Sequence, residues 1–394
     1  MKIVDVRCHV LLDPDYDIGA TSSAQDDIVV EIITDDGITG IGESDVNPWI
    51  ARAFIEAPAT HTMGRGCKEI LIGRDPLDVE GLWESLYVGT AMNGRRGAGI
   101  HAIGAIDMAL HDLRGKALGR PCHELLGGAV RNRVTPYASL QPDQANFESY
   151  KQSMVEWALM AQQLGFVAAK LEITLAGAYA HLGMNSKVER MAEVIAAVRD
   201  AVGPAMTLMV DAQYSFTDSA SCLAAIREWQ EYDVYFLETP LPSDDVAGYA
   251  RLVAEQPIPI AQGEWLATRF EFDDILRRRA VDLIQPDIGR VGGLTEARRV
   301  VQLAATYGAP VVPHVWKTGI SIAAAVHLAA TTNSIPFVEF LPGDLSSSNL
   351  RRSLLTADLT MKDGQLVVPN TPGLGVELDR DAMERFEAAA LKVG

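Results

Sequence analysis

Thr207-Leu-Met-Val-Asp211 is the first of four segments that share one form, an apolar run that ends in a carboxylate. The others are Val234-Tyr-Phe-Leu-Glu238, Pro259-Ile-Ala-Gln-Gly-Glu264 and Val281-Asp-Leu-Ile-Gln-Pro-Asp287, and a fifth segment, Pro310-Val-Val-Pro-His314, ends in a histidine. Their last residues follow one another at steps of 27, 26, 23 and 27 residues. One strand, one crossover helix and two short loops occupy a length of that order. The repeat therefore predicts successive parallel strands joined by helices.

Further segments extend this pattern in both directions. We expect the first strand at Val134-Thr-Pro-Tyr-Ala-Ser139, the second within Gly165-Phe-Val-Ala-Ala-Lys-Leu-Glu-Ile173 and the eighth at Pro336-Phe-Val-Glu-Phe340. Helices are expected over residues 147–164 and 186–201. Eight strands with helices between them predict an α/β barrel that starts near Arg131.

In a βα barrel the carboxyl ends of the strands form the active-site face. Asp211, Glu238 and Glu264 would converge there from three adjacent strands. Such convergence is costly unless a hard divalent cation lies between the carboxylates, and Mg²⁺ takes oxygen ligands. Three acids that merely cap the helices after them are the alternative. Asp287 and His314 come next and are predicted to form a carboxylate–imidazole pair.

Together these motifs resemble the enolase superfamily, mandelate racemase subgroup, over nearly the whole chain. The resemblance rests on Val210-Asp211-Ala212, Glu238-Thr-Pro240, Gly263-Glu264, Gln285-Pro-Asp287, Gly292-Gly-Leu-Thr-Glu296, Asp107-Met-Ala-Leu-His-Asp-Leu-Arg-Gly-Lys116, Gly119-Arg-Pro121 and Leu125-Leu-Gly-Gly128. It implies an α/β fold with a modified TIM (β/α) barrel at residues 131–363. An α+β N-terminal capping domain at residues 1–130 is completed by the C-terminal segment, residues 364–394.

The N-terminal part is expected to begin with three strands, the last two joined by a hairpin turn at Asp36-Gly37. Helices are expected over residues 68–127. In the family, the loop at residues 13–26 and a second loop at residues 48–66 cover the barrel mouth and set specificity. Two mobile surface loops are the alternative.

The second strand departs from the family pattern. The family often has Lys-x-Lys there, with the second lysine as a base opposite the histidine, whereas this chain has Lys170-Leu171-Glu172. Lys170 is expected to bind and polarise the substrate carboxylate, and its action as a base stays open. Glu172, on the same face, is expected to contact substrate without replacing the lysine as a base. A carboxylate has a low pKa, which Lys170 would lower further.

Further residues are expected around the substrate. Glu339, at the end of the eighth strand, resembles a family residue that hydrogen-bonds the substrate's carboxylate. Lys317 and Arg290 lie just past strand ends, where they could bind anionic groups. Tyr16, among the aspartates of the first covering loop, suits substrate hydroxyls. That loop favours a polyhydroxy monocarboxylate over a diacid, although the second loop carries two arginines.

The step implied by the resemblance is removal of a proton alpha to a carboxylate. Mg²⁺ and Lys170 would stabilise the enediolate as charge develops. With His314 as the dependable base, we expect a sugar-acid dehydratase, a lyase that gives a 2-keto-3-deoxy acid from a small-molecule carboxylate. A racemase, epimerase or cycloisomerase, which needs a second proton donor, is the first alternative. A catalytically silent, metal-dependent sugar-acid-binding protein is the alternative from another class.

Composition argues against several other classes of protein. The chain has 394 residues and a net charge of −18, which would repel nucleic-acid phosphates. Met1-Lys-Ile-Val-Asp-Val is a strand pattern and not a signal peptide, and no apolar run approaches about 18 residues, so no membrane span is expected. Four scattered cysteines indicate a cytoplasmic protein. We also expect a homo-oligomer.

Overall fold

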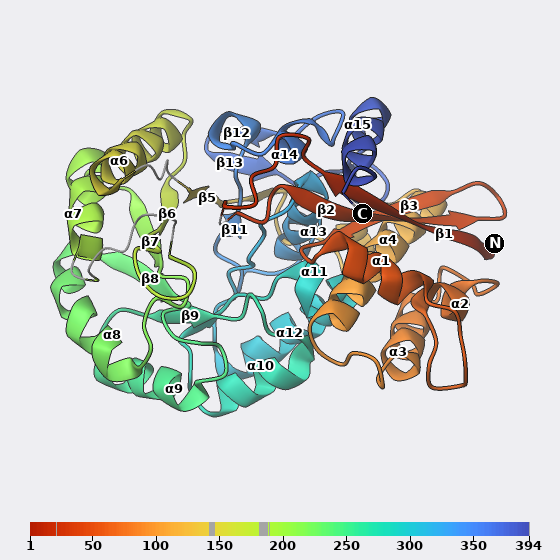
Figure 1. Ribbon diagram of the computed structural model, residues 1–394, viewed down its shortest axis with the longest axis horizontal. Helices are drawn as coiled ribbons and strands as arrows, with labels where there is room; N and C mark the ends of the chain where they lie inside the picture. The colour runs from red at the N-terminus through yellow and green to blue at the C-terminus, as the bar shows by residue number, and fades with distance from the viewer. Residues whose placement is uncertain (21, 142–145, 181–187, 189, 394) are drawn as a thin grey trace.

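The computed structural model describes every residue except 21, 142–145, 181–187, 189 and 394. It has two main parts that lie side by side (Figure 1). One is a curled parallel sheet with helices around it, and the other combines a three-stranded antiparallel sheet with helices. This arrangement confirms the predicted α/β class, a barrel with an α+β cap.

The parallel sheet has the strand order β10-β9-β8-β7-β6-β5-β11. Its strands are β5 (Pro136–Leu140), β6 (Ala168–Glu172), β7 (Thr207–Asp211), β8 (Val234–Glu238), β9 (Ile260–Gln262), β10 (Leu283–Ile284) and β11 (Val338–Glu339). The strand predicted at residues 310–314 is reduced to a single bridge between Val311 and Ile284. Pro310 and Pro313 flank that bridge, and proline has no backbone N–H to extend a ladder.

Helices α6 to α10 form an arc around the outside of the sheet (Figure 1). The barrel part contains α6 (Phe147–Gln163), α7 (Arg190–Val202), α8 (Ser219–Ile226), η1 (Arg227–Tyr232), α9 (Val246–Glu255), α10 (Thr268–Arg277), α11 (Ile288–Val291), α12 (Gly293–Tyr307), α13 (Gly319–Ala330), η2 (Gly343–Leu345) and α14 (Asn349–Ser353). The Asn146 side chain accepts hydrogen bonds from two N–H groups at the start of α6, which would otherwise lack a partner. The predicted helix 186–201 corresponds to α7, except that residues 186, 187 and 189 lie outside the described residues.

The cap is built on β1 (Ile3–Leu12), β2 (Asp26–Thr34) and β3 (Thr39–Ser44), with the predicted hairpin turn between β2 and β3. Its main helices are α2 (Cys67–Leu71), α3 (Val79–Gly89), α4 (Ala98–Leu118) and α5 (Cys122–Leu125). Helix α4 packs so closely on β3 that a Cβ at Gly40 or Gly42 would come within 2.1 Å of a backbone oxygen of α4. Although α4 is largely buried, no helix in the described part of the chain is long and apolar enough to cross a membrane.

The prediction of a second covering loop at residues 48–66 is wrong in its first half. Helix α1 (Pro48–Glu56) occupies that half and buries Ala51 and Ile55. The sequence contains a start signal for this helix. The Asn47 side chain accepts a hydrogen bond from the N–H of Ile50 and so caps the first turn. Pro48 takes a first-turn position, where a missing N–H costs nothing. The first loop joins β1 to β2 as predicted.

The C-terminal segment contacts both parts of the molecule. Strands β12 (Met361–Lys362) and β13 (Gln365–Val367) form a small sheet with β4 (Arg133–Val134), and α15 (Arg380–Ala390) packs against β1. His9 on β1 connects the two elements, with its Nδ1 atom 2.6 Å from Glu387 and its Nε2 atom 3.0 Å from Glu31. Arg380 lies 2.7 Å from Glu31. These contacts agree with the predicted return of residues 364–394 to the cap, while the domain boundaries stay a prediction.

The same contacts change how His9 and Glu31 titrate. Burial alone would lower the pKa of His9, but its bonds to Glu31 and Glu387 outweigh burial and raise that pKa above 6.5. Burial would raise the pKa of Glu31, but His9 and Arg380 lower it to about 2. The stabilisation from His9 is complete below pH 6.5 and is lost as the pH rises through its folded-state pKa. The stabilisation from Glu31 is complete above pH 4.5 and is lost as the pH falls toward 2.

We therefore expect His9→Gln to lower the free energy of unfolding by about 1–2 kcal/mol at pH 5–6. The deficit should shrink as the pH rises above that window and again as it falls toward 2. Urea unfolding at a series of pH values measures it. Arg251→Gln, which breaks the exposed Arg251–Glu255 pair, is the control and should change stability little. A deficit for His9→Gln that does not vary with pH contradicts the prediction.

Candidate active site

The inner face of the barrel carries an apolar layer with a polar layer directly beyond it. Strand side chains repeat every two residues, so on β6 Ala168 is followed on the same face by Lys170 and then by Glu172. The apolar layer is one buried cluster: Tyr137, Ala168, Met209, Phe236, Ala261, Leu283 and Val312. Two residues farther along the strands the polar layer begins, with Ser139, Lys170, Asp211, Glu238, Gln285 and His314.

The backbone turns sharply beside each of the three predicted ligands, Asp211, Glu238 and Glu264. Gly263, just before the third, has a φ of 136°, and a Cβ there would lie 2.7 Å from a buried phenylalanine ring. Thr239, just after the second, has a φ of 41°, and Tyr214, close after the first, has a φ of 59°. Left-handed backbone costs free energy in residues other than glycine and is concentrated at functional sites.

Asp211 and Glu238 are direct partners across neighbouring strands. Asp211 accepts hydrogen bonds from the Thr239 hydroxyl and from a backbone N–H two residues on, both at 2.9 Å. Glu238 is fully buried and accepts a hydrogen bond from the Gln285 amide at 2.6 Å. Its oxygens lie 3.1 and 3.0 Å from the Lys170 ammonium.

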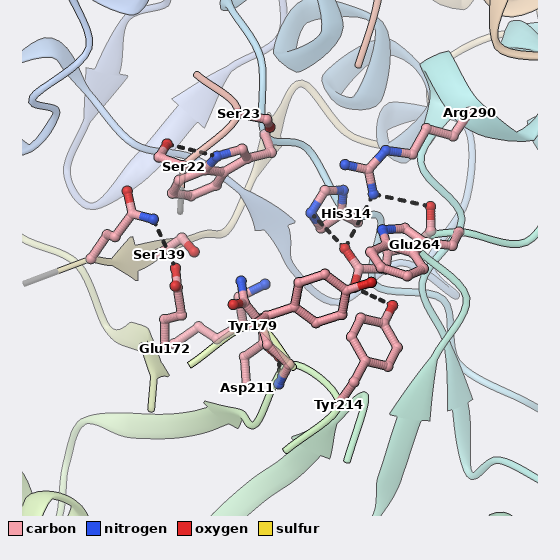
Figure 2. A pocket seen from close by; sticks show the side chains of 15 residues that line it. Ser22, Ser23, Ser139, Glu172, Tyr179, Asp211, Tyr214, Glu264, Arg290 and His314 are labelled. Atoms are coloured by element: carbon pink, nitrogen blue, oxygen red, sulfur yellow. Dashed lines mark hydrogen bonds and ion pairs between the residues drawn. The ribbon is translucent and has the colours of Figure 1, made fainter. Parts of the chain in front are cut away.

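Glu264 is held from three sides, as Figure 2 shows. The Tyr214 hydroxyl donates to Oε1 at 2.6 Å. Arg290 and His314 approach Oε2, with Nη1 of the arginine at 3.2 Å and Nε2 of the histidine at 3.3 Å. The structure thus brings the third predicted ligand against the predicted imidazole.

The three carboxylates fit a hard divalent cation by donor type and by charge. Burial, and then Glu238, hold the pKa of Asp211 well above its usual range, and Glu264 adds to the effect. A cation between buried acids would relieve this repulsion. Among the residues described, no three acidic, histidine or cysteine side chains are arranged to hold a metal ion as they stand. A cation would therefore compete with Lys170 and Arg290, which already pair with two of the acids.

The predicted carboxylate–imidazole pair is formed. His314 Nδ1 lies 2.7 Å from one oxygen of Asp287, and the other oxygen accepts a hydrogen bond from the backbone N–H of Arg290 at 3.0 Å. Burial alone would lower the pKa of His314, but Glu339, the bond to Asp287 and Glu264 outweigh it and raise the pKa to about 9. Because Nδ1 is committed to Asp287, Nε2 is the nitrogen left to act on a substrate.

Lys170 pairs with two carboxylates at once. Its Nζ atom lies 3.0 Å from Glu238 and 3.0 Å from Glu339. Burial alone would lower the pKa of Lys170, but these two acids outweigh it and hold the pKa well above its usual range. Lys170 is therefore an ammonium cation, which suits binding a carboxylate and does not suit accepting a proton. The other oxygen of Glu339 accepts a hydrogen bond from the N–H of Val315 at 2.7 Å.

Glu172 differs from its predicted state. The Gln141 amide donates to it at 3.2 Å. Burial outweighs the attraction of Lys170 and raises the pKa of Glu172 to about 7, so the expected low pKa is wrong. The physical reason is burial, which disfavours the charged carboxylate, and the nearby acids Glu264 and Glu339 add to the effect. Near neutral pH, Glu172 is divided between its acid and its carboxylate form, which suits proton transfer.

A cavity of about 200 Å³ joins these residues. Its wall includes Lys170, Glu172, Asp211, Glu264, Arg290 and His314. Glu238, Asp287 and Glu339 are buried and contact those side chains without forming part of the wall. The structure thus gathers nine of the residues predicted from the sequence at one place.

The sequence analysis missed the aromatic part of the wall. The rings of Tyr214 and Trp265 lie 4.4 Å apart between centroids, tilted by 31°, and Tyr179 meets each of them edge-on. Trp316 adds a fourth aromatic side chain. Three of the four lie within three residues of Asp211, Glu264 or His314. A search of the residues just past each strand end would have found those three.

Lys317 and Tyr16 were predicted to bind substrate, but neither lines this cavity. Lys317 donates to the carbonyl of Ser23 at 2.6 Å and lies 3.1 Å from Asp45. Tyr16 is 42% exposed and borders a different cavity. The first covering loop instead reaches the wall with Ser22 and Ser23, because Lys317 binds that end of the loop.

Comparison with known proteins shows the family to which this chain belongs. The model described as "Mandelate racemase / muconate lactonizing enzyme, N-terminal domain" matches residues 8–127, and that described as "Enolase C-terminal domain-like" matches residues 153–382. D-galactarolactone cycloisomerase of Agrobacterium fabrum is 34% identical over 98% of this chain and 99% of that protein. Arabinonate dehydratase of Saccharolobus solfataricus is 32% identical over 91% and 90%.

A solved structure shows the same similarity in three dimensions. The 3,6-anhydro-D-galactonate cycloisomerase from Zobellia galactanivorans has a TM-score of 0.84 and 31% identity, over 98% of this chain and 99% of that one. The matches cover both the cap and the barrel, and the relatives named are enzymes of sugar acids. The chain therefore belongs to the enolase superfamily, in the mandelate racemase/muconate lactonizing enzyme family.

Proposed function

We propose that this chain is a Mg²⁺-dependent sugar-acid dehydratase, a lyase that forms a 2-keto-3-deoxy acid. The observation that carries the proposal is the buried Asp287–His314 pair, at 2.7 Å, beside the Lys170 ammonium at one polar cavity. A carboxylic acid placed in this cavity would have a cation for its carboxylate and an imidazole for its alpha proton. The intact pair argues against a catalytically silent binding protein.

Asp211, Glu238 and Glu264 would hold the metal ion. When bound, Mg²⁺ would supply positive charge that stabilises the enediolate. Lys170 would bind the substrate carboxylate from the β6 side and stabilise the same developing charge. Because Lys170 is buried and paired, its ammonium group is held in place before substrate arrives.

His314 would move the protons. Positive charge bound at Glu264 would lower the pKa of His314 and so favour the neutral imidazole. Its Nε2 atom would then take the alpha proton, while Asp287 keeps the proton on Nδ1 and stabilises the imidazolium that forms. The electron pair of the broken C–H bond forms the enol double bond as the β C–O bond breaks. The departing hydroxyl takes a proton, from the imidazolium or from Glu172, and leaves as water. The enol then becomes the 2-keto-3-deoxy acid.

The charges of the cavity support a monocarboxylate with several hydroxyls. Among its described lining residues, Lys170, Arg290 and His314 each already face a carboxylate. A second substrate carboxylate would be buried without a free cation, which is costly. The serine and glutamine side chains of the wall suit hydroxyl groups, namely Ser22, Ser23, Ser139, Gln141 and Gln213.

The aromatic wall favours a second candidate function, the cycloisomerisation of a sugar acid. The adjacent Tyr214 and Trp265 rings offer an apolar surface that suits the C–H face of a ring more than an extended, fully hydroxylated chain. Two relatives named above are cycloisomerases. Such a reaction needs a second proton donor, and Glu172, with a pKa of about 7, would be that group.

Glu238→Gln should weaken Mg²⁺ binding by at least about 100-fold and abolish turnover, because a metal ligand matters more than the supporting groups whose loss costs 10–100-fold. Isothermal titration with Mg²⁺ measures this effect. Glu80→Gln, in the cap on α3, is the matched control and should bind the ion as the wild type does. An unchanged titration in Glu238→Gln would disprove the ligand assignment.

His314→Asn should stop exchange of the substrate's alpha proton with deuterated solvent, since its loss removes the proposed base. Glu172→Gln should keep exchange and lower the rate of product formation, because it removes a candidate donor to the leaving group. We expect a loss of about 100-fold or more for the histidine variant. Proton NMR of the recovered substrate gives the exchange rate, and keto-acid detection gives turnover. Exchange that survives in His314→Asn and stops in Glu172→Gln would assign the base to Glu172.

A substrate panel separates the two candidate functions. Open-chain aldonates should give keto acids with Mg²⁺, whereas aldarates should react more slowly because the cavity lacks a free cation for the second carboxylate. Sugar-acid lactones and anhydro acids belong in the same panel. If only these cyclic acids react, the chain is a cycloisomerase. A clear preference for open-chain aldarates would show that the charge argument is wrong.

A further inference from the structure

Three consecutive residues at the end of β3 reach from the cap into the barrel. Glu43 accepts hydrogen bonds from the backbone N–H of Thr318 at 3.0 Å and of Ser321 at 2.8 Å, at the start of α13. The Ser44 hydroxyl donates to the carbonyl oxygen of Gly289 at 2.8 Å. We call Glu43, Ser44 and Asp45 the β3 clamp.

The third member of the β3 clamp contacts two segments of the barrel at once. Asp45 accepts a hydrogen bond from the Arg290 guanidinium and lies 3.1 Å from the ammonium of Lys317. Glu43 and Ser44 are fully buried and Asp45 nearly so. Hydrogen bonds out of contact with water are costly to break, because the group left behind stays unpaired.

These contacts end on the two segments that directly follow the acid–base pair, helix α11 after Asp287 and the stretch from His314 to α13. Gly289 and Arg290 follow Asp287 by two and three residues, while Lys317 and Thr318 follow His314 by three and four. The bond between Asp287 and His314 therefore joins two segments, each of which is also bound to the same strand end of the cap.

Helix α11 packs closely against the cap. A Cβ at Gly104 of α4 would lie 2.2 Å from the carbonyl oxygen of Gly289, and a Cβ at Gly289 would lie 3.0 Å from the Cα of Ser44. Glycine at both positions allows this approach. The β3 clamp and α4 thus contact Gly289, two residues past Asp287, from two sides.

A further carboxyl lies beside the β3 clamp. Asp27 of β2 is fully buried, and burial, together with the neighbouring Glu43, holds the pKa of Asp27 well above its usual range. Glu43 itself faces the N-terminal end of α13, where an acidic group is favourable.

We propose that the β3 clamp positions Asp287 against His314, so that the cap helps to set the geometry of proton transfer as well as covering the barrel mouth. The residues of the β3 clamp are positioning residues, since none of them lines the cavity. This inference rests on the proposed function, because it assigns a role to the same acid–base pair.

The test compares Ser44→Ala with a matched loss of a buried hydroxyl elsewhere in the cap. The Thr90 hydroxyl, at the C-terminal end of α3, donates to the carbonyl oxygen of Leu86 at 2.8 Å and is fully buried, so Thr90→Val is the control. Ser44→Ala should lower kcat by about 10- to 100-fold, the cost of a small misplacement of catalytic groups. Its KM should change by less than about 3-fold, because the cavity wall is intact. Thr90→Val should keep both constants.

A second measurement does not depend on turnover. In protein labelled with ¹⁵N-histidine, the proton on His314 Nδ1 gives a signal that is assigned by its loss in His314→Asn. Ser44→Ala should shift that signal or broaden it by solvent exchange, and Thr90→Val should leave it in place. An unchanged signal with an unchanged kcat in Ser44→Ala overturns the proposal.

Two further outcomes can be distinguished from a failure of the proposal. If the wild type turns over no acid of the panel, the proposed function fails, while the histidine signal still decides whether the β3 clamp holds the pair. If Ser44→Ala does not fold, Glu43→Gln replaces it. That variant keeps one acceptor oxygen for α13 and should give a smaller change in the same direction. No change in either kcat or the signal in Glu43→Gln again overturns the proposal.

Discussion

The burial of charge at the barrel mouth is the constraint on which the rest of the structure depends. A charged side chain that leaves water must find a partner, and the three basic side chains here each have two. Lys170 lies between Glu238 and Glu339, and Arg290 lies between Asp45 and Glu264. His314 stands between Asp287 and Glu264. Removing any one of these side chains leaves a buried group without one of its partners.

This pairing ties together elements that are far apart in the chain. Lys170 on β6 joins β8 to β11, and Arg290 joins the loop after β9 to the end of β3 in the cap. The cap is therefore part of the site and not only a cover for it. Without β3, Asp45 would be missing and the guanidinium of Arg290 would lose one of its two carboxylates. The left-handed backbone conformations beside the acids also depend on their surroundings, since the packing around them offsets their strain.

Departures from the predictions have local physical causes. The strand at residues 310–314 is short because two prolines cannot donate to a ladder. Residues 48–56 form a helix because Asn47 and Pro48 start one, a signal that the sequence contains. The pKa of Glu172 could not be predicted, because the complete burial that raises it depends on the packing of the whole barrel mouth. The spacing of residues in the sequence does not give that burial.

The sequence by itself determined the barrel, the order of its strands and the residues at their ends. It could do so because the two-residue repeat of a strand and the spacing of about 25 residues per strand–helix unit are both local properties. Only the tertiary structure decided which acids pair with Lys170 and which nitrogen of His314 faces Asp287. It also decided that Lys317 binds the covering loop and not the cavity, and that the end of β3 contacts both α11 and the start of α13. These features depend on burial and on contacts between distant segments, which strand periodicity does not encode.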